Sequence, residues 1–326
     1  MSSALIKGAI LCTSMATAFI SGCSSDDDAD TDTTGGATAS VDGLVAFDSA
    51  RPVGEAMGAL LTALNNNDAI TALPLIDHQA NAAGIGETLR PTSVQLFGNP
   101  ALGTPLMQVN QLAGLDLPQK ILAWENEEGD TQIAYNSADY LQQRHAIVGD
   151  DSADAALQTI AGALDALSFN ASGNTEEDSD AEPLASTNVS AGEGIITVTS
   201  TQDMDSTYNT LVSAIQNAEP LLLVRELDHA ANAESVEMDL NPTRLVIFGN
   251  PNAGTPLMQI EQSIGIDLPQ KMLVFEDDGG VVTIAYNDPA YLAERHGIEG
   301  EDARLATISA ALAGLASTAA GTATAE

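Results

Sequence analysis

Basic residues, cysteines and aromatic side chains are all scarce in this sequence of 326 residues. Ten Lys and Arg stand against 46 Asp and Glu, which gives a formal net charge of −36, and only 4% of the residues are aromatic. Proteins that bind nucleic acid or an anionic lipid surface need Lys and Arg to neutralise phosphates. The charge therefore excludes nucleic acid as a partner. The apolar fraction of 44% is typical of a globular chain, and the length predicts two domains.

Residues 1–22 are predicted to form a lipoprotein signal peptide. Lys7 supplies a positive charge, and the 13-residue apolar run from Gly8 to Ile20 is too short to span a bilayer. The run is followed by Ser21-Gly22-Cys23, which resembles the bacterial lipoprotein cleavage box, where the Cys becomes the first mature residue and carries the lipid. Cys23 is therefore predicted to anchor the protein to a membrane of the bacterial cell envelope. An ordinary cleaved signal peptide is the alternative.

The residue after the anchor favours one envelope membrane. Ser24 replaces the Asp that usually retains lipoproteins in the inner membrane, so we expect the outer membrane, with the domains facing the periplasm or the surface. The other cysteine, Cys12, lies inside the signal peptide, and the mature domains contain no thiol. Disulfides, Cys nucleophiles and thiolate metal sites are thereby excluded.

The two halves of the sequence are copies of one unit. A shift of 151 residues superimposes them without a gap, and 37 of the 75 positions from Leu73 to Ile147 are identical to their partners. The predicted repeat domains are residues 43–168 and 193–318. Residues 23–42 are predicted to be an acidic disordered tether, 169–192 an acidic linker and 319–326 a disordered tail.

Each copy is predicted to be a small α+β domain with a mostly antiparallel sheet packed against helices. In the first copy, strands are predicted at 44–47, 70–76, 94–97, 120–125 and 131–135. Helical spacing predicts helices at 53–64, 138–144 and 152–167, and Thr104 before Pro105 predicts the N-cap of a helix that reaches Gln111. Strands and helices do not alternate strictly, which argues against a doubly wound fold.

Short polar motifs recur in both copies. They are Asp77-His78, Phe97-Gly98-Asn99-Pro100, Gly103-Thr104-Pro105-Leu106-Met107, Asp116-Leu117-Pro118-Gln119-Lys120, Tyr135-Asn136 and Arg144-His145, with their equivalents 151 residues later. With these motifs the chain resembles the bacterial domain of unknown function 302 family. The resemblance implies a compact α+β domain that pairs with another copy, so the two repeats are expected to form an intrachain pseudo-dimer. It implies no activity. Trp124 is Phe275 in the second copy, which argues against a role for an indole N–H.

Histidine and lysine provide the candidate functional groups. One hypothesis is that five residues of each copy form one pocket. They are Asp77, His78, Lys120, Tyr135 and His145 in the first copy and Asp228, His229, Lys271, Tyr286 and His296 in the second. There an Asp-oriented imidazole can act as an acid or base, or two imidazoles and a carboxylate can hold a divalent metal. Asp116 upstream of Lys120, or a bound anion, is the expected partner of the ammonium group.

A structural interpretation competes with this hypothesis. Asp77 can cap a helix that starts at His78, and His145 ends a short helix, where a protonated imidazole is favoured by the helix dipole.

A glycine-containing loop is the other candidate. It contains Gly98, Asn99, Gly103 and Thr104 in the first copy and Gly249, Asn250, Gly254 and Thr255 in the second. The loop leads from a strand into a helix start, where free N–H groups can receive an anion. It lacks the Gly-Lys-Ser/Thr ending of a P-loop, and two prolines remove donors, so turn and cap chemistry is the favoured interpretation.

The leading hypothesis is a non-enzymatic, lipid-anchored envelope protein that binds a small ligand or a protein partner and needs no cofactor. The alternative is a His- and Asp-dependent enzyme or a divalent-metal-binding protein with one site per repeat. A nucleophilic hydrolase has little support, because the sequence lacks a Gly-x-Ser-x-Gly elbow. An enzyme or metal site requires the two histidines of a copy to lie within about 7 Å of each other.

Overall fold

The computed structural model describes residues 41–175 and 187–322. The predicted signal peptide, Cys23 and nearly all of the predicted tether lie outside the described residues. Both repeats belong to one compact unit of the chain, and no helix in the described ranges is long and apolar enough to cross a membrane.

Each repeat contains five strands in one antiparallel sheet. Repeat 1 comprises β1 (Leu44–Ser49), α1 (Val53–Asn65), β2 (Thr71–Asp77), α2 (His78–Gly84), β3 (Thr92–Gly98), α3 (Pro100–Val109), the 3-10 helix η1 (Gln111–Leu115), β4 (Gln119–Glu125), β5 (Thr131–Asn136), α4 (Ala138–Arg144) and α5 (Asp151–Ser172). Repeat 2 comprises β6 (Ile195–Thr199), α6 (Met204–Asn217), β7 (Leu222–Asp228), α7 (His229–Glu234), β8 (Thr243–Gly249), α8 (Pro251–Ile260), η3 (Gln262–Ile266), β9 (Gln270–Glu276), β10 (Val282–Asn287), α9 (Pro289–Arg295) and α10 (Asp302–Ala319).

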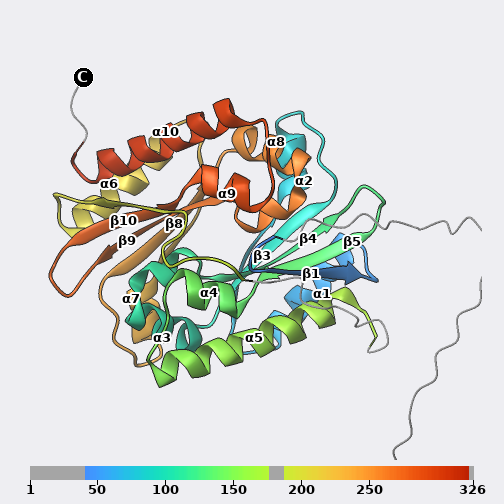
Figure 1. Cartoon of the computed structure of the whole chain (residues 1–326), viewed down its shortest axis with the longest axis horizontal. Coiled ribbons are helices and arrows are strands. Elements are labelled where there is room, and N and C mark those ends of the chain that lie inside the picture. The colour runs from blue at the N-terminus through green and yellow to red at the C-terminus, as the bar shows by residue number, and fades with distance from the viewer. Residues whose placement is uncertain (1–40, 176–186, 323–326) are drawn as a thin grey trace, which may run out of the picture. The chain divides into compact units, whose positions relative to one another are not determined.

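The two sheets have the same strand order, which confirms the predicted fold class. The orders are β1-β5-β4-β3-β2 and β6-β10-β9-β8-β7, and every paired strand is antiparallel. In the described ranges no strand of one repeat joins the sheet of the other, so the duplication produces two sheets rather than one (Figure 1).

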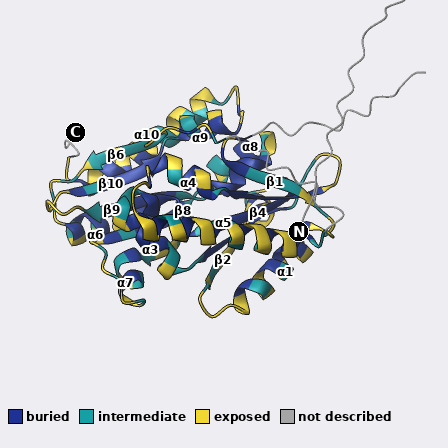
Figure 2. Cartoon of the chain, turned by 60° about the horizontal axis from the view of Figure 1, so that its bottom comes forward, coloured by how far each residue is buried: buried dark blue, intermediate teal, exposed yellow. Residues whose placement is uncertain are grey.

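Alternation along the strands gives each sheet two apolar faces. In β4, Ile121 and Ala123 face the core that repeat 1 forms with its own helices, including α1 and α5. Leu122 and Trp124 face the opposite way, into a core shared with Leu245, Ile247 and Leu273 of repeat 2. The central strands are therefore buried on both faces, and Figure 2 shows buried residues concentrated in the strands and exposed ones along the outer side of α5.

Two predicted boundaries differ from the structure. The helix predicted to begin after Thr104 begins earlier, at Pro100, because Asn99 caps it by accepting a hydrogen bond from the Ala101 amide. Proline is accepted at the first position of a helix, because the backbone N–H that it lacks would have no partner within the helix there. Asn99 can therefore be the N-cap that precedes Pro100. The first repeat also extends past residue 168, since α5 continues to Ser172 and Val189 packs into the same core.

The shared core predicts that the two repeats unfold together. Leu122→Ala removes a fully buried side chain from this core and should cost about 2–5 kcal/mol of stability. Hydrogen exchange should then show reduced protection in strands of both repeats. Leu61→Ala, at a side chain that is 39% exposed on α1, is the matched control and should change little. Loss of protection confined to repeat 1 would contradict a shared core.

Candidate functional site

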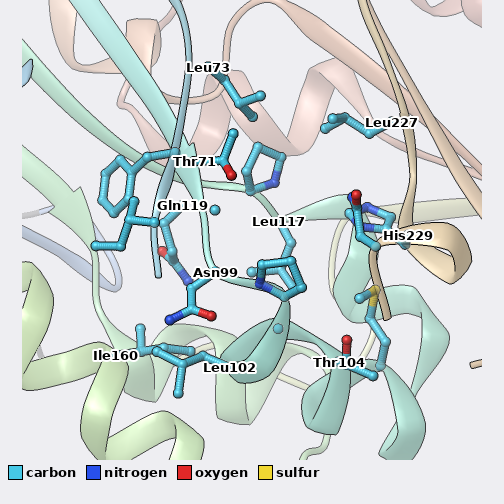
Figure 3. A pocket seen from close by; sticks show the side chains of 18 of the residues that line it. Thr71, Leu73, Asn99, Leu102, Thr104, Leu117, Gln119, Ile160, Leu227 and His229 are labelled. Carbon is cyan, nitrogen blue, oxygen red and sulfur yellow. The ribbon is translucent and has the colours of Figure 1, made fainter. Parts of the chain in front are cut away.

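Two cavities lie at equivalent places between the repeats. Pocket 1, of about 180 Å³, is walled by the end of β3 and the start of α3, the 117–119 segment and α5 of repeat 1, and by β7 and α7 of repeat 2 (Figure 3). Pocket 2, of about 460 Å³, has corresponding walls with the repeats exchanged. Each pocket is therefore complete only when both repeats are in place.

A histidine from the opposite repeat enters each pocket at the start of a short helix. Asp77 caps α2 by accepting from the Ala80 amide at 2.8 Å, which places His78 in the first turn. The His78 ring lines pocket 2 and lies against Gly265 of η3, where an added Cβ would be 3.6 Å from His78 Cδ2. Asp228 caps α7 in the same way, and His229 lines pocket 1. The structure thus confirms that Asp77 is a helix cap.

Each pocket contains three buried polar groups that lack a hydrogen-bond partner in the described part of the chain. In pocket 1 these atoms are His229 Nε2, Thr104 Oγ1 and Gln119 Nε2, and in pocket 2 they are His78 Nε2, Thr255 Oγ1 and Gln270 Oε1. The two sets occupy equivalent positions. A buried polar atom left unsatisfied costs about 1–3 kcal/mol, so a water or ligand that hydrogen-bonds to these atoms would be stabilising.

The pocket histidines are neutral at pH 7. Burial lowers the pKa of His78 to about 4, and the nearby Gly265 backbone and Asp77 charge only partly oppose this effect. Burial lowers the pKa of His229 to about 4 as well, against the Gly114 backbone and Asp228. A neutral imidazole offers Nε2 as a donor or an acceptor according to its tautomer.

The other two histidines belong to a separate buried cluster between the repeats. Asp116 Oδ2 accepts from Arg144 Nη1 at 2.7 Å and lies 2.8 Å from His145 Nε2. Arg144 Nη2 donates to Asn287 Oδ1 of repeat 2 at 2.9 Å. Arg295, Asp267, His296 and Asn136 repeat this arrangement with the repeats exchanged.

The charges of this cluster shift its pKa values. Burial by itself would raise the pKa of Asp116, but Arg144 and His145 hold it well below its usual range. Lys120 Nζ lies 3.7 Å from Asp267 Oδ1, so the expected ion pair forms with the opposite repeat instead of with Asp116. Burial and the adjacent Lys120 ammonium lower the pKa of Lys271 well below its usual value.

The predicted gathering of five residues into one pocket per copy is wrong in its geometry. His78 lies in the pocket built mainly by repeat 2, whereas Lys120 and His145 belong to the buried cluster. Tyr135 faces the helical core of its own repeat and donates to Asp165 on α5. Lys120 and Tyr135 are separated because they point to opposite faces of one sheet. The second copy is divided similarly, with His229 in pocket 1, Lys271 and His296 in the cluster and Tyr286 in its own core.

The residues of the candidate loops do line the pockets, although Gly103, Thr104, Gly254 and Thr255 lie within the helices α3 and α8 rather than in a loop. Gly98, Asn99, Gly103 and Thr104 line pocket 1, and Gly249, Asn250, Gly254 and Thr255 line pocket 2. Sequence reasoning missed Gln119 and Gln270, although the repeated Asp-Leu-Pro-Gln-Lys motif contained both. Within the described ranges, no three His, Cys, Asp or Glu residues gather as a metal site would require.

These features define a tandem α+β repeat protein with two composite pockets. Residues 45–167 and 196–315 match the family described as domain of unknown function DUF302, and the chain belongs to that family.

This chain is similar to two proteins named fluoride-specific ion channel FluC 1, one from Brucella suis biovar 1 (strain 1330) and one from Brucella abortus biovar 1 (strain 9-941). Each is 40% identical to this chain over 105 residues. The match covers 32% of this chain and 41% and 38% of those proteins, so the chain spans about two fifths of their length. The crystal structure of an uncharacterized conserved DUF302 protein from Bacillus stearothermophilus is 18% identical, with a TM-score of 0.36, and the likeness covers 39% of this chain and 98% of that one.

The buried imidazoles predict a pH dependence of stability. A folded-state pKa of about 4 lies below the ordinary histidine pKa of 6.5 for His78 and His229, so folding favours their neutral forms. Above pH 6.5 these histidines do not lower the free energy of unfolding. As the pH falls from 6.5 toward 4, the unfolded state takes up protons that the folded state does not, and the free energy of unfolding decreases by up to about 1.4 kcal/mol per pH unit for each histidine. Denaturant unfolding of a His78→Asn, His229→Asn variant should show a shallower loss of stability in this window.

The matched control is Asn81→Ala with Asn232→Ala. These side chains line the same pockets from the same helices but do not titrate. The control should keep the steep dependence of the parent. Equal slopes in the histidine variant and the parent would contradict the assignment of neutral, buried imidazoles.

Proposed function

We propose that this protein is a non-enzymatic binding module with two sites, each of which takes one small, mostly apolar molecule that carries a hydrogen-bonding group. The observation that carries the proposal is that equivalent His, Thr and Gln side chains each have an unpartnered polar atom in both pockets, the glutamine atom being Nε2 in Gln119 and Oε1 in Gln270. Each set combines residues of both repeats, so the sites arise from the pairing of the copies.

The walls of the pockets determine the kind of molecule that fits. Leu102, Met107, Leu117, Ile160 and Leu227 line pocket 1 and favour an apolar body. An engineered apolar cavity of about 150 Å³ binds benzene, so pocket 1, at about 180 Å³, suits a single ring or a short chain. Pocket 2, at about 460 Å³, suits a larger molecule.

The three polar groups favour a hydroxyl or carbonyl on the ligand. A threonine hydroxyl and a glutamine amide can each donate or accept, and a neutral imidazole offers one further site. A ligand hydroxyl that meets them removes the cost of leaving these buried atoms unpaired. A water molecule can meet the same groups, and an apolar ligand with such a hydroxyl would replace it.

The proposal places this module in the bacterial cell envelope, tethered by lipid on Cys23. The signal-like segment and the cleavage box support this location. The proposal does not include ion transport, because the match to the fluoride channel proteins spans only about two fifths of their length. The alternative of a His- and Asp-dependent enzyme or metal site stays a prediction, and the different surroundings of His78 and His145 do not favour it.

Removal of the pocket hydroxyls tests the proposal. Thr104→Val with Thr255→Val keeps the side-chain shape, and the free variant should be at least as stable as the parent because two buried unpaired hydroxyls are gone. Its affinity for benzyl alcohol should fall about two- to tenfold at each pocket, through loss of one hydrogen bond. The methyl NMR signals of Ile160 and Ile308, which line pockets 1 and 2, report binding.

Toluene is the control probe, since it has the ring without the hydroxyl. Its affinity should not fall in the valine variant. An equal loss for both probes would show that the substitution damages the pocket shape. If neither probe shifts the reporter methyls of the parent protein, the proposed function is wrong.

A further inference from the structure

We propose that the two pockets differ in ligand charge: pocket 1 takes a monocarboxylate with an apolar body, and Arg225 at its rim selects the carboxylate. This inference rests on the proposed function, because it assumes that the pockets bind small molecules. It adds the chemical class of one ligand and the residue that distinguishes it.

The Arg225 guanidinium is a cation without a partner among the described residues of a strongly acidic protein. It lines pocket 1 and is exposed, and it forms no ion pair or side-chain hydrogen bond within residues 41–175 and 187–322. The other arginines in these ranges contact carboxylates or backbone carbonyls: Arg51, Arg90, Arg144, Arg244, Arg295 and Arg304. The two lysines interact within the buried cluster.

The charges lining the two pockets have opposite signs. The described residues that line pocket 1 include Arg225 and no Asp or Glu. Those that line pocket 2 include Asp77 and, within the same described ranges, no Lys or Arg. Pro74 is the residue of repeat 1 equivalent to Arg225, so the second pocket has no counterpart of this cation. The protein has a net charge of −36, so most of its surface repels anions. A carboxylate ligand can bind where a cation such as Arg225 offsets this repulsion.

The strand that carries Arg225 leads toward the buried polar groups. A bulge in β7 ends at Arg225, and regular pairing from Arg225 to Asp228 follows. Arg225 and Leu227 then share one face of the strand, two residues apart, and His229 follows at the start of α7. Figure 3 shows Leu227 and His229 on the same side of the pocket. A ligand with its carboxylate at Arg225 can lay its apolar body along Leu227.

The apolar walls also make pocket 1 the smaller of the two. Ile160 on α5 lines pocket 1, and Ala311 takes its place on α10 in pocket 2. The larger side chain reduces the space for the ligand body. The two pockets therefore differ in size and in charge, while their hydrogen-bonding groups are the same.

Benzoate and benzyl alcohol form the probe pair, because they share a ring and differ in charge. Methyl-labelled isoleucines report each pocket: Ile70 and Ile160 for pocket 1, and Ile76, Ile264 and Ile308 for pocket 2. In the full chain, benzoate should bind pocket 1 more tightly than pocket 2. Arg225→Gln should weaken benzoate at pocket 1 about two- to fivefold, as expected for an exposed ion pair, and should weaken benzyl alcohol there less than benzoate.

Arg304→Gln is the matched control, since it changes the net charge equally. Arg304 pairs with Glu301 and lines neither pocket, so benzoate binding should stay at the level of the parent. If benzyl alcohol binds but Arg225→Gln does not weaken benzoate at pocket 1, the charge inference is overturned and the proposed function survives. If neither probe binds either pocket, the proposed function fails and the inference fails with it.

Discussion

Two guanidinium–carboxylate pairs buried between the repeats are the constraint on which the rest of the structure depends. Arg144 and Asp116 are almost fully inaccessible, as are Arg295 and Asp267. Removing one partner of a buried pair typically costs about 3–5 kcal/mol, because the remaining charge is left uncompensated. Each arginine also needs an acceptor from the opposite repeat, Asn287 for Arg144 and Asn136 for Arg295. A separated repeat would therefore leave these donors unpaired.

The same interface fixes the geometry of both pockets. The helix η1 packs against β8, β9 and β10 of the other repeat, and η3 packs against β3, β4 and β5. This places Gly114 beside His229 and Gly265 beside His78, where an added Cβ would be in van der Waals contact with the imidazole and would press against Leu273 or Leu122. The wall that carries each histidine is thus set by the pairing of repeats. Covalent linkage keeps the two halves at a high effective concentration, which favours this pairing within one chain.

The sequence predicted the elements well because their signals are local. Apolar spacing identified α1, and the motif Asp77-His78 identified a helix cap that the structure confirms. The division of the site was not predictable in the same way. Strand alternation separates Lys120 from Tyr135, but whether Lys120 meets Asp116 or Asp267 depends on how the repeats dock. No local pattern reports that contact, because the two repeats have equivalent residues to offer.

The duplication has produced two pockets of one architecture with different walls. Identity between the copies by itself shows common descent, yet about half of the aligned positions have diverged. Divergence has reached the pocket walls, where Ile160 corresponds to Ala311 and Arg225 to Pro74. The His, Thr and Gln groups have kept their positions, even though unpaired buried polar atoms reduce stability. A group retained at such a cost in both pockets must contact the part that the ligands share, and the diverged walls then contact the parts that differ.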